Sequence, residues 1–264
     1  ASIKDDTHSF IAYYDDTMLE AAIKYKTIVD EFDDAIKAGE FKMYLQPQIS
    51  AKTRRLTGAE ALVRRIKPDG TIISPIDFIP VYEKSGLISR LDRYIWEQAA
   101  AKLGEWKKAG INMSISVNIS PKDFYYIDIF NTFAGLIKKY DIEPSNLKIE
   151  ITETTIMSDV PNLMGELEEL RKAGFTLEMD DFGSGYSSLN TLKDINVDVL
   201  KVDMGFIKET KNVKKSRIIL ASVIKMAKEL NLLIITEGVE TEEQVDNLTK
   251  LGCDVFQGYY FSKA

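Results

Sequence analysis

Short apolar segments alternate with helical segments along most of this 264-residue chain. Eight segments have the length and apolar character of buried strands, at residues 43–49, 58–64, 114–119, 147–152, 175–180, 199–202, 233–236 and 255–261. Helical patterns separate most of them, at residues 75–85, 89–108, 122–139, 160–173, 187–193, 212–230 and 242–251. This alternation predicts parallel strands joined by crossover helices, and eight such units favour an α/β fold of the (β/α)8 TIM-barrel type over an open doubly wound sheet.

One further helix is expected before this pattern begins. Residues 1–14 carry little core pattern, whereas residues 17–37 place apolar side chains broadly on one side of a helix that Gly39 would end. We therefore divide the chain into an N-terminal segment with a connector helix (1–38) and a barrel domain (39–264). The helix would either pack as a lid or connect to an upstream domain.

Charge and composition exclude several classes of function. The net charge of −7 and the pI near 5.0 argue against general nucleic-acid binding, which requires many cations facing the phosphates. The single histidine, His8, lies in the polar N-terminal segment, so a Ser-His or Cys-His nucleophile has no base. Oxygen donors remain, and these select hard cations such as Mg²⁺ or Mn²⁺. The lone Cys253, the lack of an 18-residue apolar run and the polar start fit a reducing, cytoplasmic setting.

Two adjacent carboxylates, Asp180 and Asp181, end an apolar run and are followed by a loop containing Gly183 and Gly185. Adjacent strand residues face opposite sides, so both acids can serve one site only where the strand gives way to the loop. In isolation such a motif is more often a solvated turn. A metal site is the sharper interpretation, because paired acids are costly unless a cation or a buried partner neutralises them.

Polar side chains recur at the ends of the other expected strands. These are Glu60, Asn118, Glu150, Lys201, Glu237 and Gln257. Each alone has a structural explanation, such as an ion pair or a turn. Together with Asp180 and Asp181 they converge where a barrel collects its reactive groups. Five converging carboxylates call for divalent cations, two fitting better than one, and such a pair of ions suits phosphodiester hydrolysis, with Asp180 as the natural bridging ligand.

Seven motifs, in order, resemble the EAL-domain family. They are Glu60-Ala61-Leu62, Ser116-Val117-Asn118-Ile119-Ser120, Glu150-Ile151-Thr152-Glu153, the segment from Asp180 to Leu189, Lys201-Val202-Asp203, Glu237-Gly238-Val239-Glu240-Thr241 and the segment from Gln257 to Lys263. The resemblance extends over residues 41–263. The resemblance implies a barrel whose first strand is antiparallel, and a phosphodiesterase that opens cyclic di-GMP to linear pGpG.

The resemblance also implies roles for individual residues. One Mg²⁺ or Mn²⁺ would be bound by Glu60, Asn118, Glu150 and Asp180, and a second by Asp180, Asp181 and Glu237. The implied catalytic set is Lys201, Glu237, Glu60 and Asp181, with Lys201 near the attacking water. Glu153 would anchor the loop after Asp181. Separately from the resemblance, Ca²⁺ should inhibit, because it is larger and takes six to eight ligands in loose geometry. The implied substrate contacts are Gln46, Leu62, Arg64, Glu240 and Gln257.

A few positions depart from the family pattern without removing an implied metal ligand. They are Arg65, Glu178, Ser184, Met204-Gly205 and Ala264. Two alternatives stay open: a non-catalytic cyclic di-GMP receptor or protein-interaction domain, and a different barrel enzyme of the enolase type. The resemblance further implies homodimer formation and an upstream GGDEF or sensor domain in the parent protein. Whether that parent protein is anchored to a membrane stays open.

Overall fold

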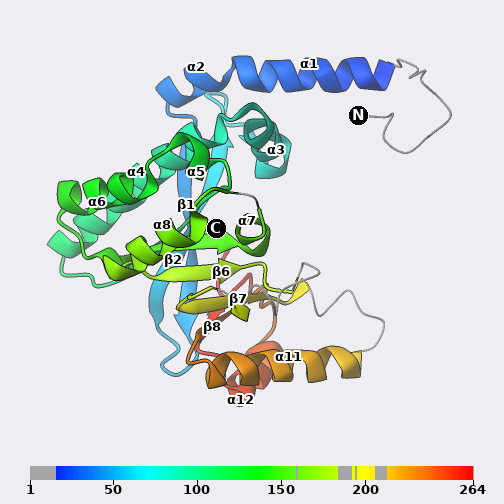
Figure 1. The fold of residues 1–264 in the computed structure, drawn as a ribbon. Coiled ribbons are helices and arrows are strands. Elements are labelled where there is room, and N and C mark those ends of the chain that lie inside the picture. The colour runs from blue at the N-terminus through cyan, green and yellow to red at the C-terminus, as the bar shows by residue number, and fades with distance from the viewer. Residues whose placement is uncertain (1–15, 159, 184–191, 194, 206–212, 264) are drawn as a thin grey trace.

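A closed barrel forms the centre of the molecule (Figure 1). The computed structural model describes residues 16–158, 160–183, 192–193, 195–205 and 213–263. The described strands are β1 (Phe41–Ser50), β2 (Leu56–Ile66), β3 (Ile72–Ile73), β4 (Ser114–Asn118), β5 (Leu147–Thr152), β6 (Leu177–Asp180), β7 (Val199–Asp203), β8 (Leu233–Glu237) and β9 (Val255–Gln257). They pair in the order β1-β9-β8-β7-β6-β5-β4-β2-β3, and pairing of β1 with β2 closes the ring. The predicted eight-stranded barrel is confirmed, with β3 as one extra strand outside it.

The first strand runs antiparallel to both of its neighbours. β1 pairs with β2 through contacts such as Gln46 opposite Glu60, and with β9 through Gln48 opposite Gln257. Strands β4 to β9 pair in parallel with one another. Only residues 51–55 separate β1 from β2, which is too short for a crossover helix and forces a hairpin. This agrees with the antiparallel first strand that the family resemblance implies.

Helices cover the outside of the barrel. The longer ones after β2 are α3 (Pro75–Ser85), α4 (Ile88–Lys108), α6 (Ile129–Tyr140), α8 (Leu163–Lys172), α11 (Val213–Glu229) and α12 (Glu242–Leu251), and the short ones are α5 (Asp123–Tyr126), α7 (Glu153–Ile156) and the 3-10 turn at Pro144–Asn146. The expectation of one continuous helix at 122–139 is wrong, because the structure has two helices there, α5 and α6, with a break between them. Ile127 is extended, and the Asp128 carboxylate accepts a hydrogen bond from the Asn131 N–H to begin α6. Most of the helix expected at 187–193 lies outside the described residues.

The expected N-terminal helix is present as two pieces, α1 (Asp16–Asp30) and α2 (Phe32–Lys37). Helix α1 extends away from the barrel along the top of Figure 1. Helix α2 buries Phe32, whose ring centroid lies 4.9 Å from that of Tyr82 and 5.9 Å from that of Phe41. The second part of the connector therefore shares one hydrophobic core with the barrel. No helix in the described ranges is long and apolar enough to cross a bilayer.

Alternation along the strands decides which residues form the site. On β5, for example, Ile149 and Ile151 are fully buried toward the surrounding helices, while Glu150 between them faces the barrel interior. The inward-facing positions of several strands are polar near their carboxyl ends. The fold thus collects polar side chains from distant parts of the chain at one end of the barrel.

Candidate functional site

The Lys201 ammonium lies at the centre of a cluster of four carboxylates. Its Nζ is 2.7 Å from Glu150 Oε2, 2.7 Å from Glu237 Oε1, 3.3 Å from Asp180 Oδ1 and 3.5 Å from Glu60 Oε2. The lysine side chain is only 1% exposed. Five strand ends, those of β2, β5, β6, β7 and β8, therefore contribute one charged group each to the same point, as the sequence predicts.

Amide side chains fix Glu60 at the edge of this cluster. Asn118 donates its Nδ2 hydrogen to Glu60 Oε1 at 3.4 Å, and Gln257 donates its Nε2 hydrogen to Glu60 Oε2. The backbone oxygen of Asn118 accepts a hydrogen bond from the Trp96 indole at 2.9 Å, which anchors the end of β4 to α4. Asn118 and Gln257 therefore belong to the site, and both contact the same carboxylate.

The two adjacent aspartates occupy different positions. Asp180 is the last residue of β6 and joins the Lys201 cluster. Asp181 has left the strand and adopts a left-handed backbone with φ of 56°, while its N–H donates to Asp180 Oδ1 at 2.9 Å. A positive φ at an aspartate is uncommon and holds the second carboxylate near the same end of the barrel. The strand does end between the two acids, as the sequence analysis requires.

Burial raises the pKa of several of these acids. It raises the pKa of Glu150 well above its ordinary value, and the negative charge of Glu60 adds to the effect. Burial likewise raises the pKa of Glu237 to about 8, although Lys201 opposes the shift. Burial also raises the pKa of Asp181, and the negative charge of Asp180 adds to that effect. Burial alone would lower the pKa of Lys201, but Glu150, Glu60 and Glu237 raise it well above its ordinary value.

The donor set fits divalent cations. One ammonium faces five carboxylates, and Glu150 Oε1 is buried without a hydrogen-bond partner among the described residues. In the described part of the chain, however, no three His, Cys, Asp or Glu side chains are grouped tightly enough to hold an ion as they stand. Oxygen ligands in excess of their counter-charge are what Mg²⁺ and Mn²⁺ require.

A cavity of about 380 Å³ lies beside the cluster and contains most of the residues implied as substrate contacts. Gln46, Leu62, Glu240 and Gln257 line it together with Glu60 and Glu237. Gln257 also donates a hydrogen bond to Gln46 Oε1 at 3.2 Å. Four of the five implied substrate contacts therefore line one cavity. That they contact a ligand stays a prediction.

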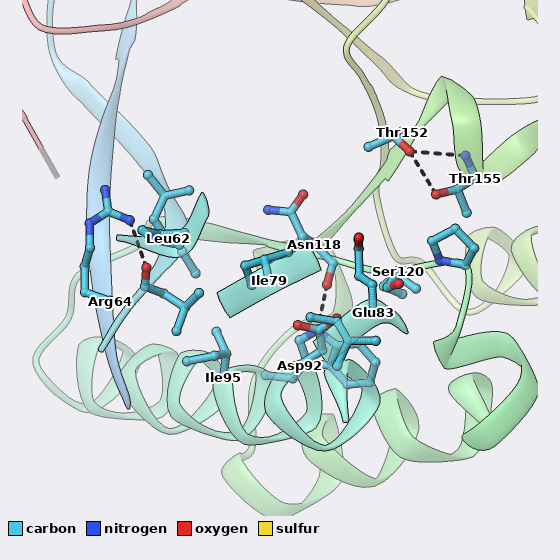
Figure 2. Close-up of a pocket in the computed structure, with 17 residues that line it drawn as sticks. Leu62, Arg64, Ile79, Glu83, Asp92, Ile95, Asn118, Ser120, Thr152 and Thr155 are labelled. Atoms are coloured by element: carbon cyan, nitrogen blue, oxygen red, sulfur yellow. Dashed lines mark hydrogen bonds between the residues drawn. The ribbon is translucent and has the colours of Figure 1, made fainter. Parts of the chain in front are cut away.

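Arg64 faces a different cavity, of about 280 Å³, between β2, α3 and α4. Figure 2 shows its guanidinium on the β2 side of this cavity, where Nη1 donates to the Val63 carbonyl oxygen at 2.8 Å. Leu62 and Asn118 line the same cavity, and Glu83 and Asp92 lie on its far side. Leu62 is thus shared between the two cavities, whereas Arg64 does not line the cavity that contains Gln46, Glu240 and Gln257.

Glu153 is 1% exposed and begins α7 directly after β5. The Thr152 hydroxyl accepts a hydrogen bond from the Thr155 N–H and caps this short helix. Burial at the rim suits an anchoring role. The loop it would anchor, from residue 184 onward, lies outside the described residues, so the anchoring role stays a prediction.

Sequence reasoning missed three inward-facing side chains. Gln48 is 1% exposed and donates to Gln257 Oε1 at 3.1 Å, thereby orienting the amide that reaches Glu60. Lys148 and Glu178 form a further ion pair inside the barrel at 2.8 Å. A usable signal existed for Gln48, because Gln46 and Gln48 alternate on β1 and must share a face. Glu178 was noted only as a departure from the family pattern.

Comparison with known proteins identifies the family. The EAL domain model matches residues 29–264. The signaling protein YkoW of Bacillus subtilis is 36% identical over 230 residues, covering 87% of this chain and 29% of YkoW. The bifunctional diguanylate cyclase/cyclic di-GMP phosphodiesterase MucR of Pseudomonas aeruginosa is 31% identical over 261 residues, covering 98% of this chain and 38% of MucR. The chain therefore spans about a third of the length of these relatives.

Solved structures agree in fold. The PaMucR phosphodiesterase in complex with c-di-GMP superposes with a TM-score of 0.83 at 33% identity, covering 90% of this chain and 96% of that one. The sequence match and the barrel topology therefore lead to the same conclusion: this chain is a member of the EAL domain family.

Proposed function

We propose that this chain hydrolyses cyclic di-GMP to linear pGpG and that the reaction depends on Mg²⁺ or Mn²⁺. The observation that carries the proposal is the cluster of Glu60, Glu150, Asp180 and Glu237 around Lys201 beside a cavity. Relatives named as cyclic di-GMP phosphodiesterases support the choice of substrate, among them the probable phosphodiesterase PdeG of Escherichia coli, which is 37% identical over 236 residues.

In this reaction a water oxygen bonds to one phosphorus, and the ester bond to the ribose 3′ oxygen breaks. The product keeps a 5′ phosphate, and the leaving oxygen takes a proton. Bound Mg²⁺ or Mn²⁺ would supply the positive charge that neutralises the phosphate and acidifies the attacking water. Glu60, Asn118, Glu150 and Asp180 would hold one ion, and Asp180, Asp181 and Glu237 the other.

The remaining side chains bind and orient. Lys201, already between Glu150 and Glu237, is close enough to the same point to hold the attacking water or a phosphate oxygen. Glu237, which lies 2.7 Å from Lys201, would accept the proton of that water. Gln257, held by Gln48, keeps Glu60 turned toward the cluster. Gln46, Leu62 and Glu240 line the cavity in which the nucleotide would lie.

The direct test is to incubate the purified chain with cyclic di-GMP and Mg²⁺ or Mn²⁺ at alkaline pH and to follow pGpG by chromatography. We expect complete conversion, and no product after chelation of the metal. Addition of Ca²⁺ should inhibit, because Ca²⁺ takes six to eight ligands in loose geometry. Intact substrate that nevertheless binds the chain would replace the enzyme proposal with a receptor function. Equal turnover with Ca²⁺ would contradict the two-ion arrangement.

A further inference from the structure

A second ion pair, formed by the buried Glu178 and the partly buried Lys148, lies inside the barrel close to the carboxylate cluster. Lys148 Nζ on β5 is 2.8 Å from Glu178 Oε1 on β6, and the two side chains are 18% and 0% exposed. Removing the Glu178 carboxylate from water costs several kcal/mol, and well-packed apolar side chains would often be as stable in the place of such a pair. The stability of the barrel alone therefore does not explain the pair.

Strand register places Glu178 next to a proposed metal ligand. Glu178 is the direct neighbour of Glu150 across β5 and β6, and of Val199 across β6 and β7. Neighbouring strands lie about 4.8 Å apart, and registered residues of a parallel pair face the same side. Lys148 precedes Glu150 by two residues and so shares its inward face. Glu178 thus stands beside Glu150, and Lys148 stands one layer farther from Lys201.

Each of the two neighbouring acids has one oxygen held and one oxygen free. Glu178 Oε1 binds Lys148, and Glu150 Oε2 binds Lys201. Glu178 Oε2 and Glu150 Oε1 are both buried, and neither has a hydrogen-bond partner among the described residues. The charges therefore follow one another as ammonium, carboxylate, carboxylate and ammonium. Lys148 offsets the repulsion that Glu178 would otherwise exert on Glu150.

We infer that Glu178 and Lys148 are positioning residues that act through Glu150 and set the affinity of the cluster for its divalent cation. The inference rests on the proposed metal-dependent function. Of the two charges, the negative one of Glu178 lies closer to Glu150, and the positive one of Lys148 lies farther away. Removing only the Glu178 charge or only the Lys148 charge leaves the other one uncompensated, so the net charge beside Glu150 changes by one unit. Removing both restores neutrality.

The test is calorimetric titration of Mn²⁺ into the chain without nucleotide. Glu178→Gln leaves the ammonium of Lys148 unpaired and should weaken Mn²⁺ binding by about tenfold or more, because an uncompensated positive charge inside the barrel repels a divalent ion. Lys148→Met should bind Mn²⁺ as tightly as the unchanged chain or more tightly. The double variant should return to within about threefold of the unchanged chain, a compensation expected for interacting sites.

Asp77→Asn provides a matched control. Asp77 pairs with Lys24 at the same distance of 2.8 Å, but on the surface, so its loss changes the net charge equally and should leave Mn²⁺ affinity unchanged. If the pair is purely structural, the double variant should bind Mn²⁺ at least as weakly as Glu178→Gln, or no variant should change in Mn²⁺ affinity. Either result overturns the inference but leaves the proposed metal-dependent function standing. Absence of Mn²⁺ binding by the unchanged chain would overturn the metal-dependent function and the inference together.

Discussion

Asp180 and Asp181 are neighbours in the chain but should contribute differently to metal binding. Asp180 reaches the Lys201 cluster, whereas Asp181 lies beyond the strand with a left-handed backbone. As the proposed bridging ligand, Asp180→Asn should weaken both ions, whereas Asp181→Asn should weaken only the second. Both should lose most turnover, because loss of such charge stabilisation costs roughly 3–4 kcal/mol or more. Calorimetric titration with Mn²⁺ measures the number of occupied sites.

Asp69→Asn is the control for this comparison, because Asp69 is exposed in the turn between β2 and β3 and should change neither turnover nor metal binding. Two fully occupied sites in Asp180→Asn would contradict its bridging role. The same holds if Asp181→Asn binds no ion at all.

Glu153→Ala should reduce turnover through the second ion rather than the first. Its buried carboxylate begins α7 beside the end of β5, and the proposed anchoring of the loop after Asp181 would hold that aspartate in place. We expect Mn²⁺ affinity to fall at the weaker site only. Glu153→Gln keeps the shape and should recover part of the affinity. Identical Mn²⁺ titrations for Glu153→Ala and the unchanged chain would exclude the anchoring role.

At the scale of residues, the sequence predicts which groups converge but not how they pair. Acids and amides at strand ends are visible because a barrel brings those ends together. The Lys148–Glu178 pair was not predicted, because it joins residues 30 positions apart and depends on the register of β5 and β6. The division of the implied substrate residues between two cavities was missed for a similar reason. It follows from the direction of the Arg64 side chain, which strand alternation alone does not determine.

At the scale of elements, the end of β9 is clamped against the loop after β8. The Val239 N–H donates to the Gln257 oxygen at 3.1 Å, and the Tyr260 N–H donates to the Val239 oxygen at 3.0 Å. Gly258, with φ of 155°, lies so close that an added Cβ would meet the Val239 oxygen at 2.2 Å. Only glycine allows this approach, which keeps Gln257, the last residue of β9, and Glu237, the last residue of β8, in fixed relation.

Gly258→Ala should therefore lower kcat/KM by about tenfold or more, because the end of β9 must move away from Val239 and Gln257 would then lose its contact with Glu60. Gly110→Ala is the matched control: it also has a positive φ, of 73°, but nothing lies within 4 Å of its added Cβ. The control should cost about 1 kcal/mol of stability and leave kcat/KM unchanged. Steady-state kinetics and urea unfolding of both variants measure this. Equal kcat/KM in the two variants would show that the close contact between Gly258 and Val239 does not contribute to catalysis.

Element types were more readable than element boundaries and directions. Residue-level periodicity is the same in parallel and antiparallel strands, so only the family resemblance indicated the direction of β1. The short 51–55 connection that forces the hairpin became apparent from the strand bounds in the structure. The break between α5 and α6 carried a local signal that was overlooked. Asp128 directly precedes an apolar helical run, which is the position of an N-cap.

At the scale of the whole molecule, Arg65 connects the N-terminal helices to the barrel. Its Nη2 lies 2.7 Å from Glu31 Oε2, between α1 and α2, and its Nε lies 2.9 Å from Glu40 Oε2, just before β1. The arginine side chain is 3% exposed, and its guanidinium carbon lies 5.7 Å from the Phe41 ring centroid. One buried cation therefore joins two acids that precede the barrel to β2.

Arg65→Met should destabilise the chain, and the loss should depend on pH. Burial opposes ionisation of Glu31, but hydrogen bonding and attraction from Arg65 prevail and lower its pKa below 4.5. A lowered pKa stabilises the fold fully above the unfolded value and loses that effect as pH falls through the folded one. The variant should therefore be less stable than the unchanged chain by about 2 kcal/mol at pH 7. This loss is smaller than for a fully buried pair because Glu31 is partly exposed, and the difference in stability should narrow toward pH 3.

Urea unfolding of both proteins from pH 3 to 7 measures this difference. Arg54→Met, which breaks the exposed 3.5 Å contact with Asp246, is the near-neutral control. A gap that stays constant with pH would exclude Glu31 as the partner that matters and leave the loss to packing.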